Sequence, residues 1–149
     1  MEVRTGEPEA IVRRVFAPWS ILVPSSFSEA YVEEGPYWHA WDDDRSVSLS
    51  GFVLDDASGP APAARIVETL PPPEGEPVDE LPAGLLGWGA EIEADPAARA
   101  SRARSGVLVA DGRVLLVTIT SDDPEWVHQT WLSIRHDPGA PSFVRAEPT

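Results

Sequence analysis

The clearest pattern of hydrophobic and polar residues lies in the last third of the chain. Residues 114–119 form a short apolar run rich in β-branched side chains, which predicts a buried strand. Asp111 and Gly112 join this run to residues 99–110, which alternate at first and then turn apolar. An Asp-Gly pair between two apolar runs favours a type I′ turn, because that turn needs positive φ at both central residues. The sequence therefore predicts a β-hairpin here.

A helix is predicted to follow this hairpin, over residues 124–136. Asp123 stands where an N-cap acceptor is expected, Pro124 suits the first helical position, and Glu125 suits the positive end of the helix dipole. One apolar face is spaced at i, i+4 and i+7 by Val127, Trp131 and Ile134. Pro138 and Gly139 are expected to stop the helix.

Alternation predicts further strands in the first half of the chain. The candidates are residues 11–16, 19–23, 37–41 and 46–54. Period-two alternation places Tyr37, His39 and Trp41 on one face of their strand and Trp38 and Ala40 on the other. In the next strand it separates two sets of side chains, Val47, Leu49 and Val53 from Ser46, Ser48 and Ser50. This pair is expected to form a hairpin with one wet face.

The middle of the chain is less regular. Residues 63–70 predict a short helix and residues 85–94 another strand. Residues 71–82 carry five prolines and four acidic residues, which predicts an exposed loop. Loops are also expected at residues 55–62 and 25–34, the latter with helical turns as the alternative.

This order of elements predicts an α+β fold. We expect a mostly antiparallel sheet of about six strands with helices packed on it. The length of 149 residues suits a single domain over residues 1–149, with flexible ends near 1–8 and 138–149.

Composition and charge limit the classes of function. The formal net charge is −14, from 25 acidic and 11 basic residues, which disfavours binding to nucleic acid or to an anionic membrane. A protein partner with a basic surface is compatible with this charge. The chain has no cysteine, so disulfides, thiolate metal sites and cysteine nucleophiles are excluded. With neither an apolar signal peptide nor a membrane-length apolar run, a cytoplasmic location is expected.

Three segments together resemble the PsbP-like fold, which is shared by a photosystem II extrinsic protein, a Ran-binding nuclear import factor and many bacterial proteins. They are the apolar run at residues 19–24 that ends in proline, the strand at residues 45–50, and the strand–helix unit at residues 112–135. The resemblance implies an α/β/α sandwich. It implies no catalytic residues, because the family has no shared catalytic set.

The acidic run Asp42, Asp43 and Asp44 is the sharpest charge cluster. A calcium loop that begins at Asp42 would need Gly and Glu where Val47 and Val53 stand. A solvated turn is therefore the favoured interpretation over a metal site, and no metal or cofactor is expected. Gly84 to Gly89 is glycine-rich but lacks the spacing of a nucleotide-binding loop. Arg102 and Arg104 are expected on the solvated face of their strand, with anion binding as the alternative.

The three histidines, His39, His128 and His136, form no metal-binding motif. His39 lies near the acidic turn, so a His–Asp pair with a serine nucleophile from the strand at 46–50 is one hypothesis. The other interpretation is a partly buried histidine within an aromatic layer.

Two functional hypotheses remain. The first is a non-catalytic interaction or accessory module, of which an acidic inhibitor or immunity-type protein is a specific form. Its candidate interaction surface comprises Tyr37, Trp38, Trp41, Asp42, Asp43 and Asp44. The second is a small enzyme or ligand-binding protein with a pocket near His39, Trp41 and nearby carboxylates. The absence of an organised catalytic motif favours the first hypothesis.

Overall fold

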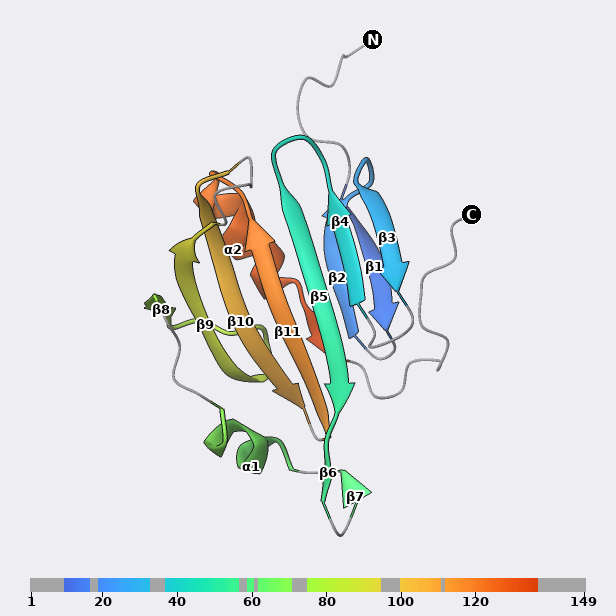
Figure 1. Cartoon of the computed structure of the whole chain (residues 1–149), viewed down its shortest axis with the longest axis vertical. Helices are drawn as coiled ribbons and strands as arrows, with labels where there is room; N and C mark the ends of the chain where they lie inside the picture. The colour runs from blue at the N-terminus through green and yellow to red at the C-terminus, as the bar shows by residue number, and fades with distance from the viewer. Residues whose placement is uncertain are drawn as a thin grey trace.

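The computed structural model describes residues 10–16, 19–32, 37–56, 59–60, 62–70, 75–94, 100–110 and 112–136. Its centre is an antiparallel sheet of seven strands, and a smaller sheet and α2 pack on one side of it (Figure 1). In spatial order the seven strands are β3 (Ser28–Val32), β4 (Tyr37–Trp41), β5 (Ser46–Val53), β11 (Arg113–Thr120), β10 (Arg102–Ala110), β9 (Leu86–Glu93) and β8 (Glu76–Val78). The predicted mostly antiparallel α+β architecture is confirmed.

The expectation of one sheet of about six strands was wrong, because the described strands form a sheet of seven, a second sheet of three and a separate pair. A three-stranded sheet contains β1 (Ala10–Phe16), β2 (Trp19–Pro24) and β12 (Arg135–His136). A small hairpin of β6 (Asp55–Asp56) and β7 (Gly59–Pro60) stands apart within the predicted loop at 55–62. The two helices are α1 (Ala63–Glu68) and α2 (Pro124–Leu132).

The main core lies between the two larger sheets and under α2. Trp19, Ile21 and Val23 of β2 and Trp131 of α2 pack there against the inner face of the seven-stranded sheet. A smaller cluster on the other face joins Ile66 of α1 to three apolar residues of β10 and β11, which are Val107, Val109 and Val114. The helices therefore lie on opposite faces of the large sheet, and each covers only part of its face.

The predicted hairpin between β10 and β11 is confirmed. Ala110 pairs with Arg113, so two residues connect β10 to β11. Gly112 has a φ of +70°, the left-handed conformation that this turn needs. Asp111, the other turn residue, lies outside the described residues.

The start of α2 is as predicted, but its end is not. Asp123 caps the helix by accepting hydrogen bonds from the backbone N–H groups of Glu125 and Trp126, at 3.1 and 3.2 Å. The helix ends at Leu132 instead of residue 136, because Arg135 and His136 pair with β2 and form β12. The ring of His136 also lies 4.7 Å from that of Trp19, which fixes this short strand against the core.

Two predicted loops contain strands. Residues 28–32 form β3, which pairs with β4, and residues 76–78 form β8, which pairs with β9. Residues 71–74 of the Pro-rich segment lie outside the described residues, as do both predicted flexible ends.

Removing the cap of α2 should destabilise the protein. We expect Asp123→Ala to lower the free energy of unfolding by about 0.5–2 kcal/mol, because the N–H groups of Glu125 and Trp126 lose their acceptor. Urea denaturation measures the change. Asp43→Ala, an exposed acid outside any helix, is the matched control; equal midpoints in the two variants would refute the capping role.

Candidate functional site

Tyr37, His39 and Trp41 form a row of aromatic rings on the outer face of β4, as the alternation predicted. The Tyr37 and His39 rings are nearly parallel, with centroids 6.3 Å apart and planes at 9°. The His39 and Trp41 centroids are 5.0 Å apart, with planes at 22°. Tyr37 and Trp41 remain 38% and 36% exposed. The row is therefore preformed, because neighbouring rings hold one another in place.

Hydroxyl groups of β5 lie beside this aromatic row. Ser48 pairs with His39 across the two strands, and its Oγ lies 2.7 Å from His39 Nδ1. The Tyr37 hydroxyl also donates to Ser48 Oγ, at 3.3 Å. Burial lowers the pKa of His39, and a hydrogen bond with the backbone of Val47 opposes part of that change. The His39 ring is consequently neutral at neutral pH.

The face that carries the aromatic row has no Asp, Glu, Lys or Arg among the paired residues of its seven strands. Directly paired residues point to the same side of a sheet, so the register identifies every member of the face. From β4, β5 and β11 these are Tyr37, His39, Trp41, Ser46, Ser48, Ser50, Phe52, Val114, Leu116, Thr118 and Thr120. We call this side of the sheet the uncharged face.

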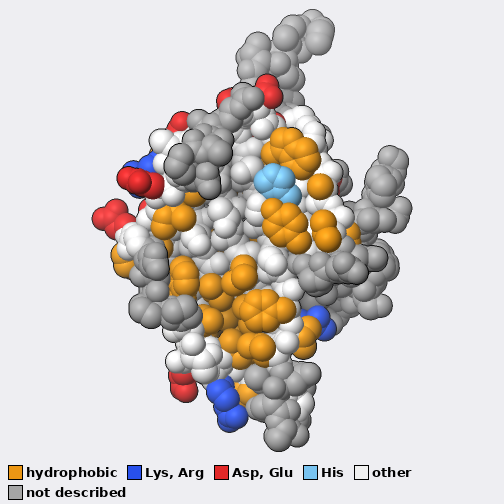
Figure 2. All heavy atoms as spheres, viewed as in Figure 1, with side chains coloured by type: hydrophobic (Ala, Val, Ile, Leu, Met, Phe, Trp, Pro, Cys, Tyr) orange, Lys and Arg blue, Asp and Glu red, His pale blue; other side chains and the backbone are white. Residues whose placement is uncertain are grey.

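Within the described part of the chain, only one end of the uncharged face is covered. Ile66 of α1 packs over Val107, Val109 and Val114 at one end. Beyond α1, Phe52 and Leu116 remain 43% and 41% exposed. Figure 2 shows hydrophobic side chains on both sides of a polar but uncharged centre, with the charged side chains near the edges. The uncharged face thus combines an exposed surface with an end that α1 covers.

Two residues of the predicted interaction surface do not belong to it. Trp38 points into the core, is 2% exposed and donates its Nε1–H to Glu29 Oε1 at 2.9 Å. Asp42 accepts hydrogen bonds from the backbone N–H groups of Asp44 and Arg45 and pairs with the Arg45 guanidinium at 2.7 Å. Of the three acids of this turn, Asp43 and Asp44 are the exposed ones, and they lie at the end of the aromatic row.

The contact between His39 and Ser48 is the arrangement closest to a catalytic one. The hypothesis of a His–Asp pair is not met by Asp42, whose carboxylate binds Arg45 and the turn backbone. Acyl transfer also needs N–H donors aimed at the oxyanion. β4 and β5 are inner strands whose backbone groups are engaged in pairing on both sides. Of the hypothesised catalytic arrangement, the described residues show the His39–Ser48 contact alone.

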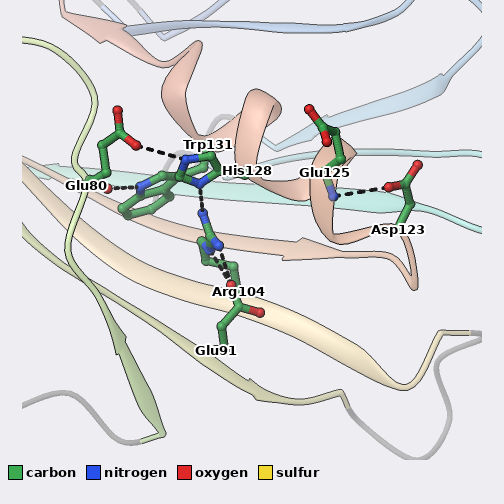
Figure 3. A network of polar contacts seen from close by, with 7 residues as sticks. All are labelled: Glu80, Glu91, Arg104, Asp123, Glu125, His128 and Trp131. Atoms are coloured by element: carbon green, nitrogen blue, oxygen red, sulfur yellow. Dashed lines mark hydrogen bonds and ion pairs between the residues drawn. The ribbon is translucent and has the colours of Figure 1, made fainter.

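A second polar cluster lies on the inner side of the sheet, around Arg104 (Figure 3). The Arg104 guanidinium donates through Nε to Glu91 Oε2 at 2.7 Å, and Nη2 contacts the same oxygen. Nη1 lies 2.9 Å from His128 Nδ1, and His128 Nε2 lies 3.0 Å from Glu80 Oε1. The expectation that Arg104 is solvated was wrong, because a strand and a helix that are distant in sequence supply its partners. Arg102, by contrast, is exposed.

The geometry of this cluster defines the tautomer of His128. A guanidinium only donates hydrogen bonds, so Nδ1 of His128 must accept from Arg104. Nε2 then carries the proton and donates to Glu80. The backbone carbonyl of Glu80 also accepts from Trp131 Nε1 at 2.9 Å. The cluster thus ties the segment before β9 to α2, which is a structural role.

Within the described parts of the chain, no group of three or more His, Asp or Glu residues is placed to hold a metal ion. Neither described helix has the length and apolarity needed to cross a membrane.

No protein-family model matches the sequence, and no curated protein matches it at a significant level. Among solved structures, the chain is similar to the solution structure of cyanobacterial PsbP (CyanoP) from Synechocystis sp. PCC 6803. The TM-score is 0.54 and the identity 11%, over 92% of this chain and 98% of that one. The chain has a PsbP-like fold. At this identity the similarity concerns the fold alone, and the resemblance found in the three sequence segments is confirmed to that extent.

Proposed function

We propose that this protein is a non-catalytic interaction module that binds another protein through the uncharged face. The observation that carries the proposal is the distribution of charge. Charged residues make up 24% of the sequence, yet the paired residues of this face include none of them. Interface centres are depleted of charged residues and enriched in Trp and Tyr, because burying an unpaired charge is costly.

The proposed partner carries basic residues around its own apolar centre. The net charge of −14 attracts such a protein at long range and repels a second copy of this chain. An acidic inhibitor or immunity-type protein is a specific form of this function, in which the bound partner is inactivated. Electrostatic attraction then acts mainly on association, and the aromatic row on dissociation.

Site-specific crosslinking tests the proposal. The natural chain has no cysteine, so Thr118→Cys introduces a single attachment point on the exposed part of the face. Gln129→Cys, on the exposed side of α2, is the matched control. Each variant receives a photoreactive maleimide and is incubated with lysate from the native host. We expect one protein to be crosslinked from residue 118, not from residue 129, and to disappear when Trp41→Ala is added.

Three results would contradict the proposal. They are equal crosslinking of the same protein from both positions, crosslinking from residue 118 that Trp41→Ala leaves unchanged, and a crosslinked homodimer as the product. Circular dichroism of each variant verifies that the fold is intact.

A second candidate function rests on the distance of 2.7 Å between His39 Nδ1 and Ser48 Oγ. If Ser48 were a nucleophile, a fluorophosphonate probe would label it. Labelling that is lost in both Ser48→Ala and His39→Gln would favour this enzymatic function over the binding module.

His39 carries the one imidazole among the paired residues of the uncharged face, and its protonation should make the free energy of unfolding depend on pH. Its pKa is lowered by burial, so the unfolded state binds the proton more tightly than the folded state does. This contribution to stability is therefore present above the unfolded pKa of about 6.5 and is lost as the pH falls through the lower folded value. We expect His39→Gln to lose less stability than the parent between pH 7.5 and pH 5, measured by urea denaturation. His128→Gln is the control, and an identical pH dependence in parent and His39→Gln would contradict the assignment.

A further inference from the structure

The uncharged face has two electrostatically different ends, and this bears on the kind of partner that it fits. One end carries Trp41, which lies in register with Ser46 and Thr120. The other carries Phe52, in register with Val114. The loops that extend past each end therefore border the face directly.

Acidic residues collect at the Trp41 end. The β4–β5 turn supplies exposed Asp43 and Asp44, and the loop between β11 and α2 supplies exposed Asp122. These loops are neighbours, because Ser46 at the start of β5 pairs with Thr120 at the end of β11. Hydrogen bonds from the backbone and hydroxyl of Ser101 lower the pKa of Asp122, so this carboxylate stays ionised well into the acidic range.

Among the described residues, the arginines near this end leave its negative charge largely uncompensated. Arg45 is engaged with Asp42, which is itself the least exposed acid of the turn. Arg102 is exposed but lies on the opposite side of the sheet, in register with Glu93. At the Phe52 end α1 carries an exposed residue of each sign, Arg65 and Glu68. Arg113 after the β10–β11 turn lies on the opposite side of the sheet, in register with Val53. Among the described residues, unbalanced negative charge therefore borders the face at the Trp41 end.

This inference rests on the interaction proposed above. We propose that the partner presents an uncharged apolar stretch to the aromatic row, and an adjoining arginine or lysine to Asp43, Asp44 and Asp122. The stretch lies over Tyr37, His39 and Trp41, where a buried charge would have no counter-ion on the sheet. The cation lies beyond Trp41, where partly solvated carboxylates can pair with it. This arrangement fixes the direction in which the partner lies on the sheet.

Two short synthetic peptides test the direction of charge. The probe is an acetylated and amidated hexapeptide of sequence LFLGRR, and the matched control is LFLGEE. Binding to the full chain is followed by the chemical shifts of Tyr37, Trp41 and Thr118 in ¹⁵N-edited spectra. We expect LFLGRR to bind at least threefold more tightly than LFLGEE at about 0.1 M salt. That ratio should approach one at about 1 M salt, where the Debye length shrinks from roughly 10 to 3 Å.

Variants separate the two parts of the proposal. Asp43→Asn with Asp44→Asn should reduce the preference for LFLGRR and leave LFLGEE binding no weaker, whereas Trp41→Ala should weaken both peptides. If both peptides shift the face residues with equal affinity, the inference about the cation fails and the docking face stands. If neither peptide shifts these residues at millimolar concentration, the docking face itself is contradicted. A shift confined to other parts of the molecule would overturn both.

Discussion

Replacing Gly106 with alanine is expected to lower the free energy of unfolding by about 2–3 kcal/mol, although only one methyl group is added. A Cβ at this position would lie 2.6 Å from Cζ3 of Trp131 and 2.9 Å from the carbonyl oxygen of Trp88. Trp131 is fully buried, and the same six-membered ring also meets Gly89, where an added Cβ would lie 2.8 Å from Cζ2. Gly89 and Gly106 pair directly, so the ring packs closely against two neighbouring strands.

A double-mutant cycle distinguishes this clash from a general effect on β10. Trp131→Leu alone removes a buried ring and leaves a cavity, which should itself be costly. In that background, however, Gly106→Ala should cost at least 1 kcal/mol less than it does in the parent, because the smaller side chain leaves space for the methyl group. Ser105→Ala, the neighbour that faces the other side, is the control. Additive costs in the cycle would show that the close contact does not limit stability.

The elements predicted best were those with local signals. The hairpin between β10 and β11 depends on Gly112, and the start of α2 on Asp123 and Pro124; each signal acts on neighbouring residues, so the sequence contains it. The strand Ser28–Val32 lacks such a signal. It forms because β4 offers a free edge, and the contact of Glu29 with Trp38 adds to this pairing across nine residues of sequence. The end of α2 was missed for the same reason, because Arg135 and His136 pair with a strand more than a hundred residues earlier.

The same distinction applies to the candidate site. Alternation alone placed Tyr37, His39 and Trp41 together and Trp38 on the opposite face, which the structure confirms. The contact of His39 with Ser48 depends on the register between β4 and β5, which alternation does not determine. The absence of charge across the face became visible only when the register of all seven strands was known. A signal was nonetheless present, since the alternate residues of the strand at 46–54 are Ser, Ser, Ser and Phe, with no charged residue among them.

The burial of Arg104 could not be anticipated from its own strand. Arg102 and Arg104 have the same spacing and the same side-chain chemistry, and both point to the inner side of the sheet. They differ because Arg104 contacts α2: its guanidinium carbon lies 5.9 Å from the ring of Trp131. Glu91 and His128, the residues that satisfy its donors, are 13 and 24 residues away.

Removing the carboxylate of Glu91 is expected to lower the free energy of unfolding by about 2–4 kcal/mol. Glu91→Ala leaves the Arg104 guanidinium in place but without its charge partner, and that side chain is only 8% exposed. Breaking a buried ion pair costs roughly 3–5 kcal/mol, and the 25% exposure of Glu91 reduces the effect because water can enter the vacated space. Denaturation by urea at pH 7 measures the loss, and Glu93→Ala on the same strand, an exposed acid, should change stability by no more than about 0.5 kcal/mol.

Replacing both partners should cost less than replacing one. In the double variant Glu91→Leu with Arg104→Met, no buried charge is left unpaired, and the methionine side chain still covers the ring of Trp131. We therefore expect the double variant to be more stable than Glu91→Ala by at least 1 kcal/mol, even though it lacks every hydrogen bond of the Arg104 guanidinium. A double variant as unstable as Glu91→Ala, or a Glu91→Ala variant as stable as Glu93→Ala, would mean that solvation, not Glu91, compensates the charge of Arg104.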